Sequence, residues 1–248
     1  MKEKKNKNPF LSIIIPVLNN KTGLEKTLKS IFKQKFKDYE VIVIDGKSED
    51  ETFKIIKKYQ KRIDKVISEK DKGIYDAINK GIDLSNGKYI NTINANDIYF
   101  SKNSLDIVKK YFTEYNYDFL FGAVLKNKVY YKYEPKKMFW SFNFYPSHSG
   151  GFFVKKILHK KIGLYSLKYP CSSDYDFFWK MIKNYNFKGG QTSKHEIISK
   201  FAKGGFSSKY SFFEHVCEET LIRINNKQNK IFVLILFFLR CLRHFQKI

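Results

Sequence analysis

Residues 68–97 read SEKDKGIYDAINKGIDLSNGKYINTINAND, and the fold and the function both depend on this stretch. An acidic turn with Asp71 and Gly73 leads into a short helical segment, and Asn86-Gly87 predicts a turn before a strand over residues 88–93. The strand ends at the polar run Asn94-Ala95-Asn96-Asp97. Ligands of α/β proteins usually bind beyond the carboxyl ends of buried strands. We therefore expect a ligand site at residues 94–97, held by a sheet that the preceding chain builds.

The chain before this stretch alternates strand and helix patterns. Apolar runs rich in β-branched residues predict buried strands at residues 11–17 and 39–44, and a third, shorter strand at 65–68. Helical stripes separate them, and Thr22 with Glu25 and Ser48 with Glu51 match the capping-box pattern at the helix starts. This β-α-β-α-β order predicts the α/β class, with a parallel, twisted sheet and right-handed crossovers.

The second half of the chain predicts a mixture of helices and short strands. A hairpin is expected around residues 126–128, and a strand that returns to the sheet is expected at 148–153. Asp174 and Asp176 lie in the first turn of one expected helix, a place where the helix dipole alone favours acidic residues. The expected helices span residues 104–115, 172–186, 211–225 and 231–245.

Composition favours a single globular domain with an unusual charge. The chain has 248 residues, 43% of them hydrophobic, and a formal net charge of +23. That charge suits nucleic acid, an anionic membrane surface or a phosphate-bearing ligand, but the lysines are spread along the chain rather than clustered. Since no helix-turn-helix, zinc-finger or RNP-like pattern occurs, we expect no nucleic-acid partner.

Other sequence features exclude several classes of protein. Cys171, Cys217 and Cys241 form no CxxC pair, which suits free thiols in a reducing cytoplasm. The N-terminus lacks the apolar core of a signal peptide, and no apolar run reaches the roughly 18 residues of a membrane-spanning helix. No GxGxxG follows the first strand, and Gly46-Lys47-Ser48 lacks the first glycine of a P-loop.

Several of these stretches, taken in order, resemble the motifs of family 2 glycosyltransferases with the GT-A fold. They are SIIIPVLN at residues 12–19, IDGKSEDET at 44–52, DKGIYDAINKG at 71–81 and INAND at 93–97. The form of the third motif, together with residues 148–153 and 173–177, resembles the branch that builds bacterial exopolysaccharides such as colanic acid. The resemblance implies a Rossmann-like, mostly parallel sheet flanked by helices.

The resemblance also implies a division of the chain. Residues 1–9 are expected to be a flexible N-terminus and residues 10–208 the GT-A domain. Within that domain, 10–100 would bind the nucleotide and 101–208 the acceptor, and 209–248 would form a C-terminal helical extension.

Roles for individual residues follow from the same resemblance. Asp174 would be the catalytic base of an inverting transfer from a nucleotide-diphosphate sugar, most simply a UDP-sugar, to a saccharide or lipid-linked acceptor. Asp45 would bind the base, and Asp71 and Gly73 would form the turn beside the nucleotide. The other residues expected to bind the nucleotide-sugar are Pro16, Val17, Asn19, Asp76, Asn79, Asn94 and Asn96.

The metal site departs from the family's usual pattern. The two aspartates of the DxD motif are Asn94 and Asn96 here, so the resemblance implies Asp97 as the ligand of a divalent Mn²⁺ or Mg²⁺ on the donor's diphosphate. His148 and Asp176 are the candidates for contact with the acceptor or the diphosphate. A structural role for His148 stays open, and Trp140 and Trp179 are expected in the core or a pocket wall.

Two functional alternatives and one structural alternative remain open at this point. A catalytically silent sugar-nucleotide-binding subunit, or a basic nucleic-acid-binding protein, would also suit parts of the pattern. The apolar run IFVLILFFL at residues 231–239, flanked by Lys230, Arg240 and Arg243, would either pack on the domain or a partner subunit or lie on anionic lipid. We expect a cytoplasmic protein that acts in cell-surface polysaccharide or lipooligosaccharide assembly. If the apolar run lies on lipid, the protein would also contact the inner face of the cytoplasmic membrane peripherally.

Overall fold

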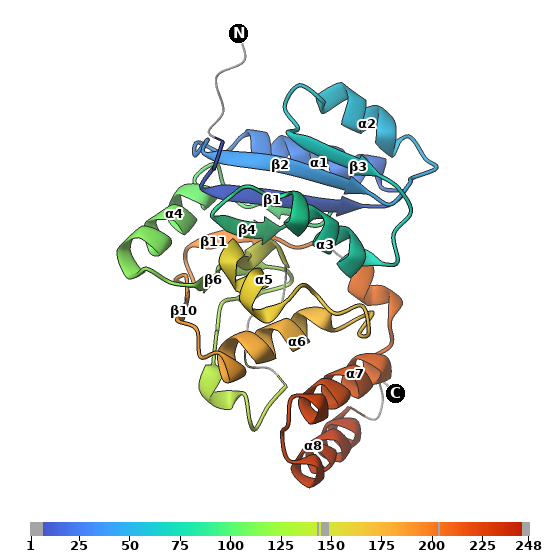
Figure 1. Ribbon diagram of the computed structural model, residues 1–248, viewed down its shortest axis with the longest axis vertical. Coiled ribbons are helices and arrows are strands. Elements are labelled where there is room, and N and C mark those ends of the chain that lie inside the picture. The colour runs from blue at the N-terminus through green and yellow to red at the C-terminus, as the bar shows by residue number, and fades with distance from the viewer. Residues whose placement is uncertain (1–6, 143, 145–148, 203, 245–248) are drawn as a thin grey trace.

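A seven-stranded sheet runs through the middle of the computed structural model, which describes residues 7–142, 144, 149–202 and 204–244 (Figure 1). The strand order is β10-β6-β9-β4-β1-β2-β3. The strands are β1 (Leu11–Val17), β2 (Tyr39–Asp45), β3 (Lys65–Ser68), β4 (Tyr89–Thr92), β6 (Phe119–Phe121), β9 (Phe152–Lys155) and β10 (Gly189–Gln191).

The predicted parallel arrangement is confirmed for the first four strands. β1 pairs in parallel with both β2 and β4, and β2 pairs in parallel with β3. The register sets Val17 opposite Asp45 and Asp45 opposite Ser68, so three strand ends lie side by side. The returning strand β9 is antiparallel to β4 and β6, which makes the sheet mixed.

Helices cover both faces of the sheet because successive strand residues point in opposite directions. Ile13 and Ile15 pack in one cluster with α1 (Lys21–Phe32), α2 (Thr52–Tyr59) and α4 (Ser104–Tyr115). Ile14 packs in the other cluster, which includes residues of α3 (Ile74–Leu84), α5 (Lys156–Ile162) and α6 (Ser173–Trp179). The continuous apolar runs of the sequence are therefore strands buried on both sides.

Both predicted capping boxes are wrong. Helix α1 begins one residue earlier than Thr22, and its N-cap is Asn20, whose side chain accepts a hydrogen bond from the Gly23 amide. Helix α2 has Glu51 as its N-cap, and that side chain makes no capping bond. The Ser48 side chain instead accepts a hydrogen bond from the Asn19 amide, which ties together the loops after β1 and β2.

A second, four-stranded sheet lies beside the first and follows the order β5-β11-β7-β8. The hairpin predicted around residues 126–128 is confirmed as the antiparallel pair β7 and β8. Because β5 pairs with β11, the loop that carries residues 94–97 lies next to residues 200–202. The strands are β5 (Ile98–Tyr99), β7 (Ala123–Leu125), β8 (Val129–Tyr130) and β11 (Ile197–Lys200), and short 3-10 turns occur at Pro135–Lys137, Ser149–Gly151 and Phe206–Lys209.

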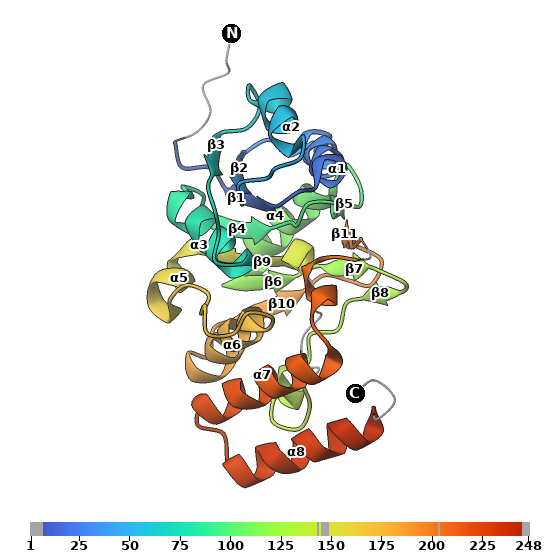
Figure 2. The ribbon, with the colours of Figure 1, turned by 90° about the vertical axis from the view of Figure 1, so that its right-hand side faces the viewer.

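The last two helices stack at the end of the molecule opposite α2 (Figure 2). Helix α6 continues as a π-helical turn over Lys180–Asn184, and α7 (Phe212–Asn225) packs against α6 and α8 (Lys230–Arg243). Trp179 is buried, as predicted, but Trp140 is 71% exposed, so of the two positions predicted for it, core or pocket wall, the core position is wrong. Within the described residues, no helix combines the length and apolarity needed to cross a bilayer.

Candidate active site

Several of the residues predicted to bind the nucleotide lie at the carboxyl ends of β1, β2 and β3. Pro16 and Val17 are buried at the end of β1, and the Asn19 Oδ1 accepts a hydrogen bond of 2.8 Å from the Glu49 amide. The buried Asp45 carboxylate accepts hydrogen bonds from the Ser68 hydroxyl at 2.5 Å and from the Ser48 amide at 3.2 Å. These bonds hold Asp45 rigidly at the strand ends.

Asp71 lies next to this group. A Cβ atom at Gly46 would lie only 2.9 Å from Asp71 Oδ2, so the two loops touch where Gly46 has no side chain. Lys80 Nζ lies 2.8 Å from Asp71 Oδ1 and 3.3 Å from Asp76 Oδ2. Burial raises the pKa of Asp71, although the hydrogen bond from Lys80 opposes that rise. Gly73, with a φ of 117°, starts α3 in a conformation that favours glycine.

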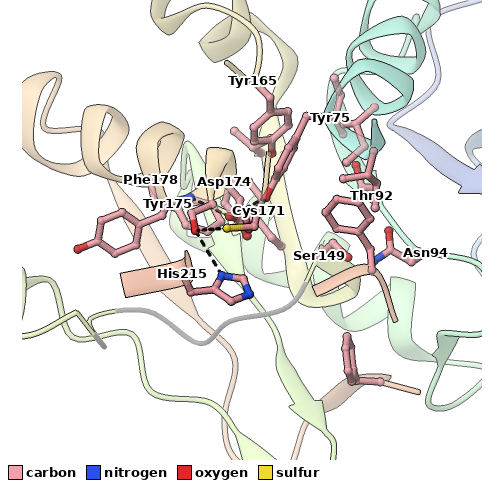
Figure 3. Close-up of a pocket in the computed structure, with 18 of the residues that line it drawn as sticks. Tyr75, Thr92, Asn94, Ser149, Tyr165, Cys171, Asp174, Tyr175, Phe178 and His215 are labelled. Atoms are coloured by element: carbon pink, nitrogen blue, oxygen red, sulfur yellow. Dashed lines mark hydrogen bonds between the residues drawn. The ribbon is translucent and has the colours of Figure 1, made fainter. Parts of the chain in front are cut away.

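A pocket of about 310 Å³ opens between α3, the loop after β4, α6 and α7 (Figure 3). Its polar lining includes Thr92, Asn94 and Ser149 on one side and Asp174 on the other. His215 of α7 also lines it, and its Nδ1 lies 3.4 Å from Ser172 Oγ. A dashed line from His215 in Figure 3 marks this contact. The pocket thus brings together the predicted base and the first residue of the predicted diphosphate loop.

Asp174 occupies the first turn of α6, where the helix dipole favours a carboxylate. Its Oδ1 accepts hydrogen bonds from the Tyr75 hydroxyl at 3.0 Å and the Tyr175 amide at 2.9 Å. Burial raises the pKa of Asp174, while these two hydrogen bonds act in the opposite direction. A carboxylate with a raised pKa in a pocket suits proton abstraction.

Helix α7 holds the first turn of α6 in place. Glu218 accepts a hydrogen bond from the Cys171 amide at 3.1 Å, and Asn226 donates one to Asp176 Oδ1 at 2.9 Å. Between them, the buried Arg223 donates to the Tyr175 hydroxyl at 2.8 Å. The predicted C-terminal extension therefore supports the very turn that carries Asp174.

The loop of residues 94–97 is folded against α1 and β11. Asn94 Oδ1 is buried in the pocket wall and makes no hydrogen bond to any described residue. Asn96 has a φ of 88° and donates its amide to Thr27 Oγ1. The Asp97 carboxylate is buried and accepts a hydrogen bond of 2.8 Å from the Ala202 amide, and burial raises its pKa to about 7.

These oxygens give a modest donor set for a divalent cation. Mg²⁺ and Mn²⁺ prefer oxygen ligands, and Asn94 offers an amide oxygen inside the pocket. The Asp97 carboxylate lies three residues further along the chain and accepts its hydrogen bond from the Ala202 amide. Among the described residues, no cluster of three or more His, Cys, Asp or Glu side chains forms a metal site. The protein's own residues therefore fit a cation that takes most of its ligands from a diphosphate and water.

Three predicted site residues have their polar atoms committed elsewhere. The side-chain amide of Asn79 donates a hydrogen bond of 2.8 Å to the Tyr165 carbonyl and accepts one of 2.9 Å from the Tyr165 amide. These bonds argue against the direct contact with the nucleotide that was predicted for Asn79. Asp76 accepts from the Lys72 amide and pairs with Lys80 at the start of α3. Asp176 binds Lys180 and Asn226 on the side of α6 that packs on α7, not in the pocket. His148 lies outside the described residues.

Sequence patterns did not single out several residues of the pocket. Tyr75 lies within a recognised motif, but nothing local indicates that its hydroxyl reaches Asp174. Lys126, His159, His215 and Glu219 also line the pocket, and none belongs to a motif. The sequence contained only weak signals for them. Lys126 is a basic residue at the predicted hairpin turn, and His215 and Glu219 are polar residues of a helix that was assigned to the C-terminal extension.

Sequence comparison relates the chain to known proteins. Residues 12–186 match the family model described as glycosyl transferase family 2. A PGL/p-HBAD biosynthesis glycosyltransferase of Mycobacterium bovis is 29% identical over 184 residues, which cover 71% of each chain. A GalNAc(5)-diNAcBac-PP-undecaprenol beta-1,3-glucosyltransferase of Campylobacter jejuni is 32% identical over 124 residues, which cover 48% of this chain and 40% of the relative.

Solved structures share the fold. The structure of S. aureus TarS 1-349 in complex with UDP superposes with a TM-score of 0.69 and 17% identity, covering 95% of this chain and 72% of that one. The mannosyltransferase PcManGT from Pyrobaculum calidifontis, in complex with GDP-Man and Mn²⁺, gives a TM-score of 0.68 and 15% identity, covering 92% and 68%. At such identities the likeness concerns the fold, and it confirms the predicted GT-A fold.

Proposed function

The chain belongs to glycosyl transferase family 2, and from that premise we propose that it is an inverting enzyme that uses a UDP-sugar and acts in bacterial cell-surface polysaccharide or lipooligosaccharide assembly. The observation that carries the proposal is the position of Asp174. It faces the same pocket as Asn94, and the Tyr75 hydroxyl fixes its orientation. The nucleotide binds at the ends of β1, β2 and β3, with Asp45 and Asp71 beside the base.

The pocket supports a single displacement. Asp174 takes the proton of an acceptor hydroxyl while that oxygen forms a bond to the anomeric carbon of the donor sugar. The bond between the anomeric carbon and the diphosphate oxygen breaks, and the nucleoside diphosphate leaves with the electron pair. Attack from the face opposite the leaving group inverts the anomeric configuration. The hydrogen bonds from the Tyr75 hydroxyl and the Tyr175 amide favour the ionised form of Asp174 and oppose the effect of burial on its pKa.

Residues in and near the loop of residues 94–97 help to neutralise the negative charge of the diphosphate. When bound, a divalent cation supplies charge that stabilises the leaving diphosphate. Asn94 and Asp97 would hold that cation, and the Mn²⁺ in the PcManGT complex supports the use of a divalent cation. Lys126 lines the same pocket, with its Nζ 4.7 Å from the centre of the Phe201 ring, and adds a fixed positive charge.

Helix α8 suits an acceptor that is bound to lipid. Six of its apolar side chains, at spacings of three and four residues, are between 45% and 72% exposed: Ile231, Leu234, Ile235, Phe238, Leu239 and Leu242. Lys230 and Arg243 lie at the two ends of this stripe, and the whole chain carries a net charge of +23. An apolar stripe with basic ends favours an anionic membrane surface. The undecaprenol-linked acceptor named for the Campylobacter relative supports a lipid-linked acceptor here.

Two measurements test the catalytic proposal. A thermal-shift panel with UDP, GDP, dTDP and ADP, each with and without Mn²⁺, should give a selective shift with UDP. Transfer from the matching UDP-sugar should be lost in Asp174→Asn while UDP binding is kept, and Asp106→Asn, in the first turn of α4, serves as the matched control. UDP binding without transfer by the wild-type chain to any acceptor would favour a silent subunit. Wild-type turnover by Asp174→Asn would reject the assignment of the base.

Membrane docking has its own test. The double variant Ile235→Glu and Leu239→Glu should lower co-sedimentation with phosphatidylglycerol vesicles. Phe53→Glu changes an exposed apolar residue of α2, at the far end of the molecule, and should not lower it (Figure 2). Equal sedimentation of both variants contradicts docking through α8. A concentration-dependent dimer that is lost in the α8 variant would show that the apolar stripe binds a second copy of the chain instead of a membrane.

A further inference from the structure

One part of the pocket wall is apolar. Ile78 of α3, Ile90 of β4 and Val154 of β9 line it, and each is at most 5% exposed. Phe178 of α6 closes another side. Burying a sugar hydroxyl against such a surface without a hydrogen-bond partner is unfavourable. This part of the wall therefore suits an apolar substituent better than a bare hydroxyl.

One polar side chain lies in this apolar surface. His159 of α5 lines the pocket, is 5% exposed and stacks on Phe177 with ring centres 4.5 Å apart. Neither ring nitrogen makes a hydrogen bond of good geometry with any described residue, although the Gly163 backbone lies close enough to act weakly on the pKa of the ring. Burial lowers the pKa of His159 to about 4, so the ring is neutral at physiological pH and carries one donor and one acceptor.

The distribution of such unpartnered atoms points to a ligand. Among the described residues, five have a buried side-chain nitrogen or oxygen without a partner: Asn94, Ser149, His159, Ser173 and Trp179. The first three line this one pocket. Because folded proteins leave few buried polar atoms unsatisfied, a concentration of them in a pocket indicates groups that a bound molecule satisfies.

We propose that the pocket selects an N-acylated amino sugar, whose acyl methyl group contacts Ile78, Ile90 and Val154 and whose amide hydrogen-bonds to His159. An acetamido group combines a methyl with one N–H donor and one carbonyl acceptor, which matches an apolar surface that contains a neutral imidazole. Ser149 then binds a ring hydroxyl, while Asn94 remains beside the diphosphate. The inference rests on the proposed function, since it takes the pocket to hold a sugar, and the sugar can be the donor's or the acceptor's.

The experiment has one arm for each source. In the donor arm, titration calorimetry compares UDP-GlcNAc with UDP-glucose and UDP-GalNAc with UDP-galactose. In the acceptor arm, saturation-transfer NMR without nucleotide compares methyl N-acetylglucosaminide with methyl glucoside. We expect a preference for the acetamido sugar of at least about tenfold in one arm, equivalent to ~1.4 kcal/mol. Equal binding of both members of every pair overturns the inference.

His159→Phe identifies the residue responsible. Phenylalanine keeps the stack on Phe177 and removes the two unpartnered nitrogens, so the variant should fold with an unchanged or higher Tm. It should bind UDP like the wild type and lose the preference for the acetamido sugar. His195→Phe, an exposed histidine, is the matched control and should keep the preference. A preference retained in His159→Phe contradicts the role of His159.

The two proposals fail in different ways. If no nucleotide binds, the donor-site proposal fails, and the acceptor arm still decides whether the pocket selects an acetamido sugar. If UDP binds and neither arm shows a preference, the donor-site proposal stands and the inference about the amino sugar is wrong.

Discussion

The Tyr75 hydroxyl donates a hydrogen bond of 3.0 Å to Asp174 Oδ1, although the two residues are 99 positions apart in the chain. Tyr75 belongs to α3 and Asp174 to α6, so the bond joins the half of the chain expected to bind the nucleotide to the half expected to bind the acceptor. The hydrogen bond favours the ionised carboxylate, whereas burial opposes it. Tyr75 is thus a positioning residue that also adjusts the basicity of Asp174.

Tyr75→Phe should shift the pH dependence of transfer. Loss of the hydrogen bond raises the pKa of Asp174 further, so the acidic limb of kcat/KM should move to higher pH by about one unit. The effect should be largest at low pH and shrink where the base is already ionised. Tyr111→Phe, which removes a hydroxyl bound to the remote Glu196, controls for the loss of a tyrosine hydroxyl elsewhere. If the acidic limb of Tyr75→Phe lies at the same pH as that of the wild type, Tyr75 does not influence the pKa of the catalytic base.

Asn79→Ala distinguishes a wall residue from a nucleotide ligand. The side chain of Asn79 holds the Tyr165 backbone, and Tyr165 lines the pocket with its ring centre 5.6 Å from that of Tyr75. We expect a raised KM for the sugar substrate, an unchanged Kd for UDP and a loss of about 1–2 kcal/mol in stability. A large loss of UDP affinity with unchanged stability would instead support the direct contact predicted from the motif.

Asp97→Asn tests the metal assignment. Asparagine can accept the hydrogen bond of the Ala202 amide, so the loop should keep its conformation. If Asp97 is the ligand, loss of its charge should reduce the enhancement of UDP binding by Mn²⁺ by about tenfold, measured by calorimetry. If Mn²⁺ enhances UDP binding equally in the variant and the wild type, Asp97 only holds the loop through the Ala202 amide. Asn94→Ala would then be the variant to test for metal binding.

Arg223 should be one of the most sensitive positions for stability. Its guanidinium is fully buried, donates to the carbonyls of Met138 and Ser141 and to the Tyr175 hydroxyl, and lies 4.2 Å from the centre of the Phe142 ring. Arg223→Met removes the buried donor of these three hydrogen bonds, so urea unfolding should show a loss of about 3 kcal/mol or more. Arg243→Met, an exposed position on α8, should change stability by less than about 0.5 kcal/mol.

His159 should make the fold sensitive to mild acid. Burial holds its pKa at about 4 in the folded protein against 6.5 for the free side chain. The unfolded chain therefore binds a proton that the folded chain does not, and stability is lost as the pH falls from about 6.5 to about 4. The fall corresponds to at most roughly 3 kcal/mol. His159→Phe should flatten this part of the stability curve, measured by urea unfolding at each pH, and an unchanged slope would contradict the assignment.

The amino-acid sequence by itself determined the alternation of strands and helices and the family. Runs such as Ile13-Ile14-Ile15 are strands because β-branched residues suit a pleated backbone, and a run apolar at every position must be buried on both faces. The order of polar residues after those runs placed Asp45, Asp71 and residues 94–97 at one edge of the sheet, because parallel strands end there together. The first turn of α6 with Asp174 was also local information, although the capping boxes show that local patterns can mislead by a few residues.

Only the tertiary structure decided which side chains meet. Tyr75 reaches Asp174, Asn79 turns to Tyr165 instead of the nucleotide site, and α7 brings His215 and Glu218 to the turn that carries the base. Contacts of this kind depend on how helices cross the sheet and on the packing of large side chains far apart in sequence. Periodicity and propensity describe neighbours along the chain, so they contain no information on the partner that a hydroxyl or an amide finds after folding.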